Sequence, residues 1–143
     1  MPGYQKILVV VDLADGSERV AIAARDLGAL THAAIIALHV IEFVPVEPMG
    51  ESLIPTMQVE ESLIASAREK LAALAARLDL ADIRLRVEAG SIKAEILRIA
   101  EEEGADLIVV GSRERHGLAI LMNFTEDTVL HAARCDVLAV RLR

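Results

Sequence analysis

An apolar run that stops at a glycine is the strongest candidate for chemistry in this chain. Asp106 begins the run, Gly111 and Ser112 follow it, and a charged loop and a helix-like segment extend as far as Asp136. In α/β proteins a strand, a loop and a helix in this order form phosphate sites, because the free backbone N–H groups at the start of a helix attract anions. The stretch is therefore the first candidate for an anion site.

Motifs of other kinds of catalytic site are absent from the sequence. It has no glycine-rich dinucleotide loop, no Walker-type phosphate loop, no zinc-protease helix and no serine-hydrolase elbow. His32, His39, His116 and His131 fall on different predicted elements without metal-ligand spacing, which argues against a zinc site. Cys135 precedes a strand and is interpreted as a small buried apolar residue rather than a reactive thiol.

The composition predicts a layered α/β protein. Of the 143 residues, 54% are hydrophobic, yet the chain has only one Tyr, two Phe and no Trp. The core must therefore consist of Ala, Val, Ile and Leu side chains that interdigitate between helices and a sheet. A chain of this length buries enough surface to fold without a metal or a disulfide.

The charge and the apolar pattern of the sequence argue against nucleic-acid binding and against a membrane span. The 15 Lys and Arg residues against 22 Asp and Glu residues give a net charge of -7, and no basic cluster offsets it, so we expect no nucleic-acid binding. No apolar run approaches the ~20 residues that span a bilayer. A single cysteine and a start without a secretion-signal pattern predict a cytoplasmic protein.

Strand and helix patterns alternate along the chain and predict one domain over residues 1–143. Right-handed crossovers then give a doubly wound five-stranded parallel sheet in the order 3-2-1-4-5, with helices on both faces and the half-polar third strand at one edge. The segment Glu42–Pro55, which holds three prolines, is predicted to be a surface loop. The five predicted strands cover residues 6–11, 34–41, 83–88, 106–110 and 137–142.

Capping residues and charge predict where the helices begin, end and face solvent. Asp15 to Glu18 has the D-x-x-E pattern of a helix start, and Gly104 is expected as a left-handed C-cap. Glu101–Glu103 are expected on the solvent side of that helix. On the long second helix Lys70 falls among the polar residues. Its apolar face is expected to hold Val59, Leu63, Ala67, Leu71, Leu74 and Leu78.

The predicted strand order also locates a crevice. Ligands of doubly wound sheets bind outside the carboxyl ends of the strands, where the strand order reverses and neighbouring strands diverge. Here strands one and four diverge. We therefore expect Asp12, Val40 and the loop at Gly111 to line the same crevice.

Four segments together indicate a family. They are Ile7 to Asp12, Leu38-His39-Val40, Ala105 to Arg113, and Cys135 to Arg141. In this order and at this spacing they resemble the universal stress protein family, UspA type, and the resemblance covers the whole chain. It implies an adenine-nucleotide alpha-hydrolase-like fold and a role in the stress response.

The resemblance also shows where this chain departs from nucleotide-binding members, whose loop after strand four reads G-x-x-G, then eight or nine residues, then G-[ST]. Gly111 matches the first glycine, but Glu114 replaces the second with bulk and a carboxylate. Asn123 and Phe124 replace the closing pair, with Thr125 one place further on. Asn tolerates a left-handed turn, whereas Phe124 removes a hydroxyl whose bond to a phosphate is worth ~1.5 to 3 kcal/mol.

Two readings of the nucleotide site stay open. If ATP binding is retained, the resemblance assigns the ribose to Asp12 and adenine to the backbone of Val40; Asp12 is equally well explained as a residue that ends a strand. The phosphates would then meet Gly111, Ser112, Arg113, Asn123 and Thr125.

Arg113, Arg115 and His116 can also hold a phosphate by charge, but we interpret them as a solvated basic loop. The preferred reading is a non-enzymatic stress-response protein with little or no ATP affinity and no cofactor. The alternative is an ATP-dependent switch or slow ATPase.

The last strand predicts a partner. An apolar sheet edge must be covered, blunted or paired, and two copies of the chain can pair about a two-fold axis. We therefore expect a homodimer, as the resemblance also implies; the alternative is that a loop or the chain terminus covers the edge. The expected interface residues are Val137, Leu138, Ala139, Val140 and Arg141.

Overall fold

A five-stranded parallel sheet forms the centre of the protein. The computed structural model describes residues 3–13, 16–42, 53–80, 83–113, 129 and 131–142, with the backbone alone described for 53–59 and 113. The sheet has the order β3-β2-β1-β4-β5, which confirms the predicted fold and topology. The strands are β1 (Lys6–Val10), β2 (Ala34–Glu42), β3 (Arg84–Gly90), β4 (Leu107–Arg113) and β5 (Asp136–Leu142).

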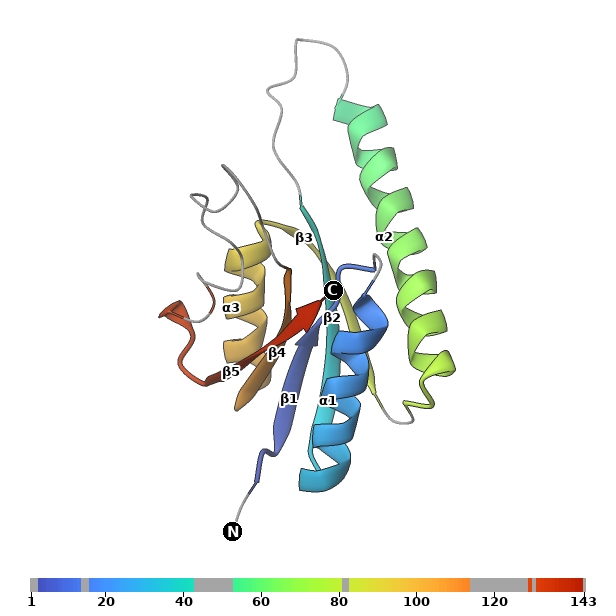
Figure 1. Cartoon of the computed structure of the whole chain (residues 1–143). Coiled ribbons are helices and arrows are strands. Elements are labelled where there is room, and N and C mark those ends of the chain that lie inside the picture. Colours follow the sequence, from blue (N-terminus) through green and yellow to red (C-terminus); the bar gives the residue numbers. More distant parts are fainter. Residues whose placement is uncertain are drawn as a thin grey trace.

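Helices cover both faces of the sheet (Figure 1). Helices α1 (Ser17–Thr31) and α2 (Leu53–Arg77) lie on one face, and α3 (Ile92–Glu103) lies on the other. The side chains of each strand alternate between the two cores, so a strand covered on both faces needs a continuous apolar run. In β1, for example, Ile7 and Val9 join the core beneath α1 and α2, while Leu8 joins the core beneath α3.

Two helix ends show how the chain turns between layers. Gly104 adopts a left-handed conformation with φ 70°, and its N–H donates to the carbonyls of Ala100 and Glu101, which confirms it as the C-cap of α3. Helix α1 ends at His32, which takes the same conformation with φ 57°. Asp15, part of the predicted start of α1, lies outside the described residues.

Several predicted boundaries were wrong by one or more residues, including those at β4, β2 and α2. Strand β4 does not stop before Gly111 but continues to Arg113, because the residues from Gly111 onward pair with the last three residues of β5. Strand β2 includes Glu42. Helix α2 begins at Leu53, so Pro55 lies in its first turn, where the missing N–H of proline costs no hydrogen bond. The part of the predicted loop at residues 43–52 lies outside the described residues.

The solvent side of α3 was also predicted incorrectly at one residue. The side chain of Glu103 is only 6% exposed, and its Oε1 accepts a hydrogen bond from Arg86 Nη1 at 2.9 Å. The third strand lies at a sheet edge, as predicted. Its polar face is exposed at Arg84, whose side chain is 64% exposed, whereas Arg86 is 16% exposed and pairs with Glu102 and Glu103 of α3.

Candidate ligand cleft

The sheet opens where β1 and β4 separate. These two strands pair only from Ile7 with Leu107 to Val9 with Val109. Beyond that point β1 stays with β2, since the N–H of Val11 donates to the carbonyl of Leu38 at 2.9 Å. This divergence is the switch point at which such sheets bind ligands.

A cleft of about 420 Å³ lies at this end of the sheet, between α2 and the carboxyl ends of β1 and β2. We call it the α2 cleft. Asp12 and Val40 both line it, which brings two of the predicted site residues together. Asp12 is exposed, whereas the Val40 side chain is buried in the core beneath α3, so its backbone is the part a ligand can reach. The lining residues are Asp12, Leu13, His39, Val40, Ile41, Glu42, Leu63, Ser66, Ala67, Lys70 and Ile92.

His39 fixes the floor of the α2 cleft. Its Nδ1 lies 2.7 Å from the carbonyl oxygen of Val11. Because a carbonyl only accepts, Nδ1 must carry the proton and donate it, and in the neutral ring Nε2 is then the free acceptor. This role was not predicted from the sequence, in which His39 was considered as a metal ligand and as part of the segment Leu38-His39-Val40.

The turn after β1 is strained. Leu13 has φ 61°, a left-handed conformation that is unfavourable for a bulky side chain. The surroundings impose it: Val11 is tied to β2 through both its N–H and its carbonyl, and Leu13 packs against the core beneath α1 and α2. Residues on either side of Asp12 are therefore held in fixed positions.

Gly111 is a glycine for a reason of packing. A Cβ atom at this position would lie 2.7 Å from Leu142 Cδ1 and 3.2 Å from Val20 Cγ2. Gly111 lies on extended strand β4, and it is not among the glycines with positive φ. The match to a cradle glycine is thus explained by the core and needs no phosphate.

The rest of the predicted phosphate loop remains a prediction. Ser112 and the backbone of Arg113 belong to β4, and Ser112 is not among the described residues that line the α2 cleft. Glu114, Arg115, His116, Asn123, Phe124 and Thr125 lie outside the described residues.

The last strand forms the other candidate surface. Leu138 and Ala139 are exposed, Val137 and Val140 are half-buried, and Arg141 is exposed. Among the described strands, β5 pairs with β4 on one side only, so the other side of its backbone lies at the open edge of the sheet.

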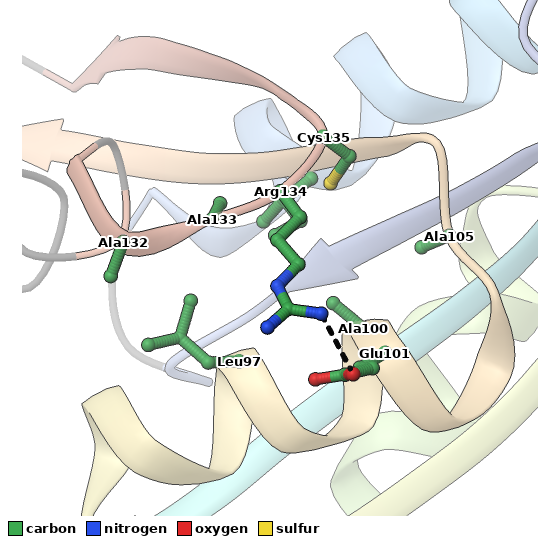
Figure 2. A pocket seen from close by; sticks show the side chains of 9 residues that line it. Leu97, Ala100, Glu101, Ala105, Ala132, Ala133, Arg134 and Cys135 are labelled. Carbon is green, nitrogen blue, oxygen red and sulfur yellow. Dashed lines mark hydrogen bonds and ion pairs between the residues drawn. The ribbon is translucent and has the colours of Figure 1, made fainter.

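Cys135 lies beside a smaller cavity of about 120 Å³ at the opposite end of the sheet. Figure 2 shows Arg134 extending toward Glu101, 3.4 Å away, with Cys135 next to it in the chain. Burial, together with the negative charges of Asp136 and Asp106, raises the pKa of the Cys135 thiol. A raised pKa keeps the sulfur protonated and supports the interpretation of Cys135 as a packing residue.

The described residues contain neither a membrane-spanning helix nor a cluster of metal-binding side chains. None of the described helices is long and apolar enough to cross a membrane. Within the same residues, no three His, Cys, Asp or Glu side chains converge as a metal-binding group.

Comparison with known proteins gives a consistent match over the whole chain. Residues 3–141 match the profile of the universal stress protein family. Universal stress protein A homolog 2 of Coxiella burnetii is 35% identical over 144 residues, which covers 100% of this chain and 99% of that relative.

Two solved structures share the fold. The universal stress protein UspA from Lactobacillus plantarum superimposes with a TM-score of 0.81 at 22% identity, covering 96% of this chain and 98% of that one. A universal stress protein in complex with cAMP gives a TM-score of 0.68 at 22% identity, covering 96% and 97%.

Proposed function

Because the chain belongs to the universal stress protein family, we propose that it is a cytoplasmic stress-response protein that acts by binding rather than by catalysis, as a homodimer with little or no affinity for ATP. The packing of Gly111 against Leu142 and Val20 carries the last part of this proposal. Because core packing alone explains the glycine at this position, its match to the first glycine of the family's phosphate loop is no longer evidence for a phosphate site.

The sequence departures point in the same direction. A polyphosphate needs close approach to bare backbone and a set of preorganised donors. Glu114 places a carboxylate where the family has a glycine, and Phe124 replaces a hydroxyl donor. Each change weakens the binding of a multiply charged anion.

The α2 cleft supports binding better than catalysis. Nucleophilic catalysis needs a hydroxyl, thiol or carboxylate in contact with a base that a third group orients. Within the described part of the cleft, His39 Nδ1 bonds to the carbonyl of Val11 and not to Ser66 or to a carboxylate. The cleft therefore resembles a recognition site.

The edge of β5 supports the homodimer. One side of the β5 backbone has no partner strand within the described part of the chain, and Leu138 and Ala139 expose apolar side chains on this strand. An antiparallel copy of the same strand satisfies both requirements at once, because a two-fold axis brings identical groups together.

Calorimetric titration of the purified dimer with ATP and Mg²⁺ tests the nucleotide part. We expect no saturation below about 1 mM, which corresponds to a binding free energy weaker than about -4 kcal/mol. The triple variant Glu114→Gly, Asn123→Gly, Phe124→Ser should gain at least about tenfold in affinity. Micromolar binding by the unchanged protein would overturn this part of the proposal.

An ATP-dependent switch is the second candidate. It is favoured by one observation, that Asp12 and Val40 meet in the α2 cleft at the switch point. The neighbour in complex with cAMP is a separate protein at 22% identity, and its likeness to this chain extends to the fold. The same titration separates the two candidates, since a switch must bind ATP in the micromolar range.

A further inference from the structure

We propose that the α2 cleft binds a small organic molecule with an apolar body and a single anionic group, and that Lys70 recognises that group. The proposal goes beyond the function given above. It depends neither on the dimer nor on the affinity for ATP.

One stripe of α2 forms a wall of the cleft. Leu63, Ser66, Ala67 and Lys70 are spaced i, i+3, i+4 and i+7, so they lie on one side of the helix and all line the cleft. Below them the same stripe continues through core residues such as Leu71 and packs against the sheet. Figure 1 shows the N-terminal part of α2 extending past the end of β1. Within the stripe, Leu63, Ser66 and Lys70 are exposed, whereas Ala67 is buried in the core beneath α1 and α2.

The cleft is apolar where a ligand body would lie. Leu63 is 49% exposed, although it continues a stripe that is buried further along the helix. The opposite side offers further aliphatic side chains and the backbone of β2. The aliphatic side chains are those of Leu13, Ile41 and Ile92, and the backbone is that of Val40. A cavity of a few hundred Å³ with apolar walls and a few polar groups is typical of small-molecule sites.

Lys70 supplies the positive charge of the cleft. It is the only Lys or Arg among the lining residues, and it has no ion-pair partner within the part of the chain that the structure describes. Two carboxylates, those of Asp12 and Glu42, also line the cleft. Direct contact with the Lys70 ammonium can hold one anionic group of a ligand, whereas the two carboxylates oppose any further negative charge, such as that of a polyphosphate.

Hydrogen bonds and packing hold the floor of the cleft in place. The bonds from Val11 N–H to Leu38 and from His39 Nδ1 to Val11 hold the end of β1, and Leu13 keeps a strained left-handed backbone. A rigid floor reduces the ordering cost of binding, so the remaining contacts contribute more fully to affinity.

Two fluorescent probes with a common aromatic framework test the proposal. 8-Anilinonaphthalene-1-sulfonate carries one negative charge, and N-phenyl-1-naphthylamine has the same aromatic body without it. We expect the charged probe to bind with one site per chain. Lys70→Met should weaken it at least about tenfold, because a charge-assisted hydrogen bond is lost, and should leave the neutral probe unchanged.

Matched variants separate the cleft from the rest of the surface. Arg68→Met removes the same charge from the exposed surface of the same helix, outside the cleft, and should change the affinity for the charged probe less than twofold. Leu63→Ser should weaken both probes, because it removes part of the apolar wall. Lys70→Arg should retain the charged probe.

Several results would overturn the proposal. They are an absence of charged-probe binding below 1 mM, an equal effect of Lys70→Met and Arg68→Met, or no effect of Leu63→Ser. All four substitutions lie at exposed positions of α2, and circular dichroism checks that each variant is folded. ATP titration and the mass of the dimer, measured on the same samples, report on the proposed function separately.

Discussion

The two edge strands of the sheet, β3 and β5, carry different side chains. At β3, Arg86 donates to Glu103 at 2.9 Å and to Glu88 at 2.6 Å, and Arg98 of α3 bonds to Glu95 at 2.8 Å. At β5 the exposed residues are Asp136, Leu138, Ala139 and Arg141, so two apolar side chains lie between two charged ones near the ends of the strand. Leu85 on β3 and Leu138 on β5 are both 37% exposed, so the contrast lies in the charged network and not in apolar exposure.

This difference shows that the two edges of one sheet can differ in how readily they pair with another chain. Charged side chains on an edge strand discourage pairing with another chain, because pairing would require them to lose water. An apolar edge with outward backbone groups favours pairing. The β3 edge is thus blocked by charge, and the β5 edge is the one suited to a second copy of the chain.

The largest expected effect comes from placing the same charge on each edge. Leu138→Asp should raise the dimer dissociation constant by about three powers of ten, or about 4 kcal/mol, because each dimer would bury two unpaired carboxylates. Ala139→Asp should act in the same direction. Sedimentation velocity over a range of concentrations measures the shift toward monomer.

Leu85→Asp is the matched control for this experiment. It introduces the same side chain at an equally exposed position on β3 and should leave the mass of the dimer unchanged. A dimer that survives Leu138→Asp, or dissociates with Leu85→Asp, would contradict the assignment of the interface to β5.

Breaking the charged network should cost stability. Arg86→Met leaves the nearly buried carboxylate of Glu103 without its closest partner, and we expect a loss of about 2 to 3 kcal/mol in the free energy of unfolding. Urea denaturation followed by circular dichroism measures it. Arg134→Met breaks an ion pair whose side chains are 87% and 71% exposed and should cost less than about 0.5 kcal/mol. Equal losses would show that burial of Glu103 is unimportant.

A smaller effect is expected where β5 contacts β4. Gly111→Ala should destabilise the protein by about 1 to 2 kcal/mol, because the new methyl group meets Leu142 and Val20. Leu142→Val in the same chain shortens one of these side chains and should restore part of the loss. If Gly111→Ala alone is neutral in denaturation, packing does not explain this glycine.

The smallest effect is a pH dependence at the β3 edge. The hydrogen bond from Arg98 lowers the pKa of Glu95. Its contribution is therefore present above the ordinary Glu pKa of about 4.3 and is lost as pH falls through the lower folded-state value. We expect a few tenths of a kcal/mol at this partly exposed pair. Denaturation curves between pH 6 and about 3 should be flatter for Glu95→Gln than for the unchanged protein, and parallel curves would exclude the effect.

Much of the fold could be predicted from the sequence because its main determinants are local. The apolar runs, the alternation in β3 and the cap at Gly104 each follow from neighbouring residues. The end of β4 could not be predicted in this way. It depends on pairing with β5 across some thirty residues, and Gly111 reads as a strand terminator unless its contact with Leu142 is known.

The candidate site was predictable only in part. Asp12 and Val40 were found because residues at strand ends meet at the switch point. Lys70 was assigned to the polar side of α2, and its place in the cleft depends on how far that helix extends past the sheet. The role of His39 depends on the depth at which β1 and β2 pair, since its ring reaches the carbonyl of Val11.

The charged network at β3 also limits how far copies of this chain can assemble. If molecules joined through both edges, their sheets would add end to end into a filament. When two copies meet through β5, the outer rims of the combined sheet are both β3, and each carries its own set of arginines and glutamates. If the proposed dimer forms through β5, its growth would therefore stop at two copies.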